Sequence, residues 1–221
     1  MNSTERLRVI NEHITKAQKK SPLASSHITL IAVSKTHPAE AIVPLIGAGQ
    51  KIFAENRVQE AAEKWPAICE KHADIELHLI GSLQTNKVKE ALLLFDVMHT
   101  VDRPALVDAI VKEIGKSTSI RCKQFFVQVN IGEESQKGGV NPADLPGLME
   151  YINQAGLSIS GLMCVPPVGI EPAPHFALLY KMAYELKLPN LSMGMSADYE
   201  TAVRLGATHI RVGTALFGER Q

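Results

Sequence analysis

The segment Leu30-Ile31-Ala32-Val33-Ser34-Lys35-Thr36 decides the fold that we expect for this chain. Its apolar, β-branched run predicts a buried strand that ends at a lysine, and Pro38 marks the turn into a helix. A lysine at the mouth of a packed sheet is partly desolvated, which favours the neutral amine that Schiff-base chemistry needs. For the isolated residue, the alternative is a strand-end lysine that extends its ammonium group to solvent.

Seven further short runs resemble this first strand, and amphipathic stretches lie between them. Most runs are continuously apolar, as in Phe125-Phe126-Val127-Gln128-Val129, which is typical of parallel strands buried on both faces. Eight strands alternating with helices predict an α/β fold, a single-domain (β/α)8 barrel over residues 1–221. The alternative is an open doubly wound sheet, although its GxGxxG signature is absent after the first strand. The expected strands are 29–35, 51–55, 76–81, 96–101, 124–130, 158–165, 190–194 and 209–213.

An additional amphipathic helix is expected before the first strand, over about residues 3–20. Leu7, Ile10, Ile14 and Ala17 fall on one stripe of this helix. Too few residues follow the eighth strand to form a closing helix. We therefore expect the N-terminal helix to cover the place that the last barrel helix would fill.

Two helix starts are predicted from capping residues. Asp102 is the expected N-cap for residues 103–114, and Ser196 is the expected N-cap for residues 197–205. His99 ends the fourth strand just before Asp102. We interpret the two as a residue at the rim of the barrel and a helix cap, not as a catalytic pair.

Composition narrows the class of protein. The 23 basic and 23 acidic residues balance, so nothing indicates binding to nucleic acid or an anionic membrane. The start of the chain lacks a signal-peptide core, and no apolar run reaches the roughly 20 residues of a membrane-spanning helix. Cys69, Cys122 and Cys164 are widely separated, which favours reduced thiols and a cytoplasmic location. The histidines show no metal-binding spacing.

Polar residues at the strand ends are expected to form one site, because barrels carry their chemistry at the C-terminal ends of the strands. The first strand supplies Lys35, and the second supplies Asn56, for which capping of the next helix is the alternative. Arg211 precedes Gly213 by two residues, so both face the same way. An arginine inside a barrel needs a ligand or a carboxylate as partner, and both options remain open.

The loops after the seventh and eighth strands are rich in glycine and hydroxyl residues. They read Ser192-Met193-Gly194-Met195-Ser196 and Arg211-Val212-Gly213-Thr214. Barrels commonly bind phosphate at these two places; the glycines permit close backbone approach, and Ser196 and Thr214 supply hydroxyl donors. The alternative is ordinary tight-turn glycine. A lysine and a phosphate site in one barrel mouth indicate pyridoxal phosphate, held as an internal aldimine by Lys35.

Segments along nearly the whole chain carry a family resemblance. They are Ala32-Val33-Ser34-Lys35-Thr36, Glu55-Asn56-Arg57-Val58-Gln59-Glu60, His78-Leu79-Ile80-Gly81-Ser82-Leu83-Gln84-Thr85-Asn86-Lys87, Val129-Asn130, Lys137-Gly138-Gly139, Gly161-Leu162-Met163, Leu191-Ser192-Met193-Gly194-Met195-Ser196-Ala197-Asp198, Val212-Gly213-Thr214 and Phe217-Gly218. Together they resemble the pyridoxal-phosphate homeostasis protein family, a single-domain relative of the alanine racemase barrel.

The resemblance implies roles for individual residues. It implies a Schiff base on Lys35, and it implies that Arg211 faces the pyridine nitrogen. It also implies phosphate contacts from Ser196, Gly213 and Thr214, with help from the backbone of Gly194 and Met195. Asn56 and Ser192, at the ends of the second and seventh strands, complete the expected cofactor-binding set.

The residues argue against efficient amino-acid chemistry. Racemisation needs two bases on opposite faces of the substrate carbon. Racemases resemble this chain but place the second base, a tyrosine, on a further β domain, whereas this sequence ends at Gln221. An arginine on the pyridine nitrogen would keep that atom unprotonated and a weak electron sink. The tyrosines all fall on expected helices: Tyr151, Tyr180, Tyr184 and Tyr199.

We therefore expect a monomeric protein that holds, buffers or delivers pyridoxal phosphate, with apoenzymes that use this cofactor as possible transient acceptors. One alternative is a weak or specialised amino-acid racemase that depends on the cofactor. A third reading is a phosphate-sugar barrel enzyme whose lysine forms a different Schiff base.

Overall fold

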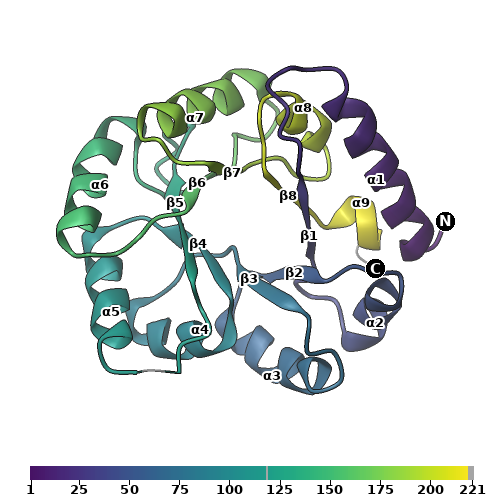
Figure 1. Ribbon diagram of the computed structural model, residues 1–221, viewed down its shortest axis with the longest axis horizontal. Helices are drawn as coiled ribbons and strands as arrows, with labels where there is room; N and C mark the ends of the chain where they lie inside the picture. Colours follow the sequence, from purple (N-terminus) through teal and green to yellow (C-terminus); the bar gives the residue numbers. More distant parts are fainter. Residues whose placement is uncertain (118, 219–221) are drawn as a thin grey trace.

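The computed structural model describes residues 1–117 and 119–218, so Gln221 lies outside it. Within these residues, eight parallel strands close into a barrel in which each strand pairs with the next and β8 pairs with β1 (Figure 1). The strands are β1 Thr29–Val33, β2 Ile52–Glu55, β3 Glu76–Leu79, β4 Val97–Val101, β5 Gln124–Val129, β6 Gly161–Cys164, β7 Asn190–Ser192 and β8 His209–Val212. Each lies inside its expected range. The (β/α)8 barrel is confirmed, and the open sheet is wrong.

Helices surround the barrel on its outer face (Figure 1). They are α1 Ser3–Gln18, α2 Ala39–Gly47, α3 Val58–Cys69, α4 Val88–Leu94, α5 Pro104–Ile114, α6 Leu145–Gln154, α7 Ala173–Glu185, α8 Tyr199–Arg204 and α9 Thr214–Phe217, with short 3-10 turns at η1 Thr85–Lys87 and η2 Pro142–Asp144. Apolar side chains from the helices and the strands form one continuous buried cluster between the two layers. No helix of the described residues is long and apolar enough to span a membrane.

The N-terminal helix α1 lies between α8 and α2 and beside the single turn of α9 (Figure 1). Its stripe of Leu7, Ile10, Ile14 and Ala17 is buried, as the sequence pattern predicts. A capping box between the start of α1 and Asn2 fixes where the helix begins. The helix therefore occupies the place where an eighth barrel helix would otherwise close the ring.

Both predicted N-caps are wrong. α5 begins at Pro104, with Arg103 in the N-cap position, because the Asp102 carboxylate pairs with Arg103 Nη1 at 2.6 Å instead of with the helix backbone. α8 begins at Tyr199, three residues after Ser196. The Ser196 hydroxyl is not available as a cap, because it accepts backbone N–H groups from the loop after β8.

Candidate functional site at the barrel mouth

Strand register brings the expected site residues to one edge of the barrel. Ile31 of β1 pairs with Arg211 of β8, and Val33 of β1 pairs with Ala54 of β2. Continued along the chain, this register places Lys35 next to Asn56 on one side and just beyond Gly213 on the other. The ends of β8, β1 and β2 therefore form one continuous segment of the mouth.

The turn that carries Lys35 is held from α3. The residue after it, Thr36, has a left-handed backbone with φ of 66°, which is costly for a β-branched residue. Its N–H donates to Glu60 Oε1 at 2.5 Å, and Lys64 Nζ donates to the Ser34 carbonyl oxygen at 3.0 Å. These contacts compensate the strained backbone and fix the half-buried Lys35 at the mouth.

A buried carboxylate organises these contacts. Glu55 Oε1 accepts from Ser34 Oγ at 2.7 Å and from Trp65 Nε1 at 3.0 Å, and it forms an ion pair with Lys64 Nζ at 2.7 Å. Burial raises the pKa of Glu55, while the hydrogen bond and charge of Lys64 oppose that shift. Sequence reasoning assigned no role to Glu55 or Lys64. The available signal was an acidic residue in the otherwise apolar run Ile52–Glu55.

The loops after β7 and β8 are joined through Ser196. Its Oγ accepts from the backbone N–H groups of Gly213 at 3.3 Å and Ala215 at 3.1 Å. Gly194 has φ of 92°, and a Cβ at this position would lie 2.5 Å from Ala202 Cβ. Glycine is therefore required at Gly194 both for the backbone turn and for the packing of α8.

Met195 and Thr214 complete the two loops. The Met195 N–H donates to Asp198 Oδ1 at 2.5 Å, so this N–H supports the start of α8. Thr214 is exposed and is the first residue of α9. Ser196 and Ala215 also line a hollow between α1, α8 and α9.

Arg211 points into the barrel and is 4% exposed. Its Nη1 donates to Ser192 Oγ at 2.7 Å, and its Nη2 donates to the Cys164 carbonyl oxygen at 2.8 Å. No carboxylate forms an ion pair with it among the described residues, so the structure offers no support for the salt bridge to a neighbouring strand. Burial lowers the pKa of Arg211 from its usual value. It nevertheless remains a cation, because a guanidinium is protonated throughout the range in which proteins fold.

Asn56 does not cap α3. That helix begins at Val58 with Arg57 in the N-cap position, and no side chain caps it. Asn56 Oδ1 is buried and accepts no hydrogen bond from the described residues. A buried polar atom without a partner costs free energy, so Asn56 is suited to contact a ligand at the mouth.

The expectation that His99 lies at the rim is wrong. It is fully buried inside the barrel, where its ring stacks on Phe126 with centroids 4.4 Å apart and an angle of 3° between the ring planes. Its Nε2 lies 2.9 Å from His78 Nδ1, and its Nδ1 lies 2.9 Å from Ser192 Oγ. Burial holds the pKa of His99 well below its usual value. The sequence feature that could have predicted the burial of His78 and His99 is their position within short, largely apolar strands.

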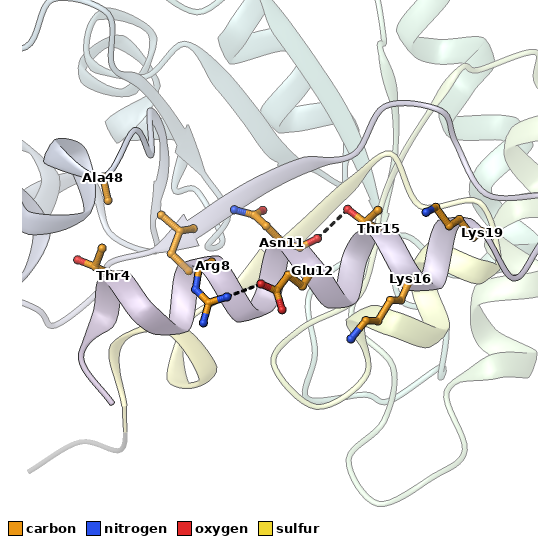
Figure 2. Close-up of a pocket in the computed structure, with 9 residues that line it drawn as sticks. Thr4, Arg8, Asn11, Glu12, Thr15, Lys16, Lys19 and Ala48 are labelled. Carbon is orange, nitrogen blue, oxygen red and sulfur yellow. Dashed lines mark hydrogen bonds and ion pairs between the residues drawn. The ribbon is translucent and has the colours of Figure 1, made fainter.

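A groove on the outer surface does not contain the residues expected at the cofactor site. The groove is lined by α1 and by Ala48, and Figure 2 shows its polar side chains. Two contacts there, Arg8 with Glu12 at 2.5 Å and Thr15 Oγ1 with the Asn11 carbonyl oxygen at 2.9 Å, lie within α1 itself. In the part of the chain that the structure describes, no cluster of His, Cys, Asp and Glu side chains forms a metal site.

The protein is a barrel with a lysine at the end of β1 and with glycine loops that carry hydroxyl side chains after β7 and β8. Known proteins that resemble this chain identify the class of protein to which such a barrel belongs. The family model described as "Alanine racemase, N-terminal domain" matches residues 6–221. The pyridoxal phosphate homeostasis protein of Aquifex aeolicus is 40% identical over 231 residues, with 100% of each chain covered. The human protein of the same name is 35% identical, covering 97% of this chain and 85% of its own.

Solved structures give the same result. PipY of Synechococcus elongatus, with PLP bound, is 38% identical with a TM-score of 0.83, covering 98% of this chain and 100% of its own. An alanine racemase of Clostridium difficile is 17% identical with a TM-score of 0.69, and the match covers 98% of this chain and 56% of the racemase. This second likeness concerns the fold alone. The chain belongs to the alanine racemase N-terminal domain family and, within it, to the pyridoxal phosphate homeostasis proteins.

Proposed function

We propose that this chain is one cofactor-binding domain that holds pyridoxal phosphate covalently on Lys35 and takes part in the homeostasis of that cofactor. The observation that carries the proposal is the convergence of Lys35, Asn56 and Gly213 on one segment of the barrel mouth, through the register of β8, β1 and β2. The names of the relatives, and the PLP bound in PipY, support the same cofactor.

The residues at the mouth fit the chemistry of this group. Lys35 supplies an amine for the aldehyde, and Asn56, whose Oδ1 has no partner among the described residues, supplies an acceptor for the ring substituents. Ser196 Oγ accepts from the backbone N–H groups of Gly213 and Ala215, which leaves its hydroxyl proton as a donor for the phosphate. When bound, the cofactor supplies an aldehyde and a conjugated ring that can withdraw electrons.

Several features favour holding or delivering the cofactor over turning over amino acids. Arg211 is a permanent cation and donor on the β8 side of the interior, and such a group beside the ring nitrogen disfavours protonation of that atom. Tyrosine, which the racemase reading requires as a second base, lies only on outer helices among the described residues. These are Tyr151 on α6, Tyr180 and Tyr184 on α7, and Tyr199 on α8. A monomeric, cytoplasmic protein with apoenzymes as transient acceptors remains our proposal.

The visible absorbance spectrum of the purified protein tests the anchor. We expect wild type with added pyridoxal phosphate to show a yellow band, and borohydride to fix the cofactor onto the Lys35 peptide in mass spectra. Lys35→Ala should lose both signals. Lys51→Ala is the matched control, because Lys51 is exposed and precedes β2 at the opposite end of the barrel, where it pairs with Asp74. A wild type that stays colourless contradicts the proposal.

A second measurement separates the carrier from the racemase. We expect wild type to exchange the α-deuterium of a panel of amino acids no faster than free pyridoxal phosphate does. Exchange well above that background, abolished in Lys35→Ala, would contradict the carrier function and favour the racemase.

A further inference from the structure

A chain of hydrogen bonds crosses the inside of the barrel from Arg211 to the start of β3. Arg211 Nη1 lies 2.7 Å from Ser192 Oγ, which lies 2.9 Å from His99 Nδ1. His99 Nε2 lies 2.9 Å from His78 Nδ1, and His78 Nε2 lies 2.7 Å from Glu76 Oε1. Five side chains from β3, β4, β7 and β8 are thus connected, and they run from the cofactor side toward the opposite end of the barrel.

The two ends of this chain fix the direction of every bond in it. A guanidinium only donates hydrogen bonds, and an ionised carboxylate only accepts them. Ser192 Oγ therefore accepts from Arg211, and its own hydroxyl proton is free to go to His99 Nδ1. At the other end, Glu76 requires a proton on His78 Nε2. His78 Nδ1 is then the acceptor of a proton carried by His99 Nε2.

The opposite direction is excluded by a contact between two acceptors. If His99 carried its proton on Nδ1, its Nε2 would accept from His78 Nδ1, and a neutral His78 would turn a bare Nε2 toward Glu76 Oε1 at 2.7 Å. With a neutral His78, only one direction of the chain remains, and in it both imidazoles carry their proton on Nε2. Burial and the neighbouring charge of Arg211 keep the pKa of His99 well below its usual value, which supports a neutral His99 ring. The hydrogen bond from His78 holds the pKa of Glu76 below its usual value, which supports an ionised carboxylate.

Packing leaves the chain little freedom. His99 is fully buried and stacked on Phe126, and His78 and Ser192 are also fully buried. The second nitrogen of the guanidinium is held by the Cys164 carbonyl oxygen. A buried cation without a carboxylate partner needs such fixed dipoles to compensate its desolvation.

We propose that His78, His99 and Ser192 are positioning residues, anchored on Glu76, that hold the Arg211 guanidinium in one orientation toward the ring of the bound cofactor. The role toward the cofactor rests on the proposed function. The direction of the hydrogen bonds does not rest on the proposed function, because all of them join side chains of this protein. The hydrogen-bond path from Arg211 to the surface-facing Glu76 couples this acidic residue to the cofactor site although it lies at the far end of the barrel.

Nitrogen-15 NMR of histidine in the cofactor-free protein tests the orientation directly. We expect His78 and His99 to carry a proton on Nε2 and to accept a hydrogen bond at Nδ1, and we expect the Arg211 side-chain N–H signals to exchange slowly with water. Glu76→Ala should produce mixed histidine tautomers and faster Arg211 exchange, whereas Glu76→Gln retains an acceptor oxygen and should preserve both signals. A His99 protonated on Nδ1 in wild type would overturn the proposal.

The matched control is His209→Gln. This imidazole also lies inside the barrel, 6.1 Å from His99 between ring centroids, but its Nδ1 hydrogen bond goes to Thr208 Oγ1 and not to the chain. We expect its replacement to leave the tautomers of His78 and His99 unchanged. If His209→Gln disturbs them as much as Glu76→Ala does, the effect comes from general packing and the positioning role is wrong.

The cofactor-bound protein tests the consequence for the site. We expect Ser192→Ala and Glu76→Ala to shift the pH midpoint of the bound cofactor's absorbance by about half to one unit, which is the worth of one hydrogen bond. Glu76→Gln and His209→Gln should leave the midpoint in place, and an unmoved midpoint in Ser192→Ala and Glu76→Ala contradicts the role. If Ser192→Ala does not fold, the half-exposed Glu76 still decides the question. If the protein binds no pyridoxal phosphate, the proposed function is refuted. The NMR experiment on the cofactor-free protein still tests the direction of the hydrogen bonds by itself.

Discussion

Phe176 of α7 and His99 of β4 are both fully buried, yet they belong to two different kinds of interior. Phe176 lies in the layer between strands and helices, where apolar side chains form one continuous cluster. His99 lies inside the barrel, where two small apolar clusters flank a polar chain that ends in a cation and a carboxylate. The difference teaches that the outer layer supplies the stability of the fold, whereas the inside of the barrel is shaped for the site.

The outer layer also contains a buried polar contact. Glu55 and Lys64 form a buried ion pair between β2 and α3, and its contacts reach the turn that carries Lys35. Buried ion pairs add little net stability, because desolvation opposes their attraction. We interpret this pair as a device that fixes the position of Lys35.

The largest effect is expected in the outer layer. Phe176→Ala removes a fully buried aromatic ring from the main cluster and should lower the free energy of unfolding by about 3–5 kcal/mol. Urea unfolding of the cofactor-free protein measures it, and Phe176→Leu is the control with a smaller loss. A loss of less than about 1 kcal/mol would contradict the assignment of stability to this layer.

The next effect comes from the inside of the barrel and depends on pH. Burial lowers the pKa of His209 to about 4. Between about pH 6.5 and pH 4 the unfolded chain therefore binds a proton at this residue that the native protein does not, so stability falls as the pH falls. The pKa difference corresponds to about 3 kcal/mol.

Unfolding free energies at about pH 7 and about pH 4 check this expectation in wild type and His209→Gln. The acid-induced loss should be smaller in the variant, because the variant lacks the imidazole of His209. Equal losses would mean that His209 gains its proton in the folded state as easily as in the unfolded one.

The smallest effect on stability is expected at the mouth itself. A Cβ at Gly213 would lie 3.4 Å from the Val33 carbonyl oxygen and would meet no closer atom, and the backbone φ of −113° lies outside the left-handed region that favours glycine. Gly213→Ala should change the free energy of unfolding by less than about 1 kcal/mol. It should nevertheless weaken the binding of pyridoxal phosphate about tenfold, or about 1.4 kcal/mol, by narrowing the mouth.

Titration of the cofactor-free protein with pyridoxal phosphate measures this affinity. Gly147→Ala is the control, because Gly147 is exposed on the outer helix α6 and a Cβ there meets nothing within 4 Å. If the affinity of Gly213→Ala matches that of Gly147→Ala, Gly213 does not lie against the phosphate, and the predicted cradle is wrong.

The sequence alone determined the barrel, its eight strands, the buried stripe of α1 and the placement of Lys35 at the end of β1. These features depend on local periodicity and on strand ends, which a pattern of apolar residues reports directly. Only the tertiary structure decided the partners of the polar residues. Ser192 and His99 are 93 positions apart, and they meet only because the sheet closes on itself. The predicted cap at Ser196 failed for the same reason, since its hydroxyl binds the loop after β8, whereas Asp102 pairs with its neighbour Arg103 and not with the helix backbone.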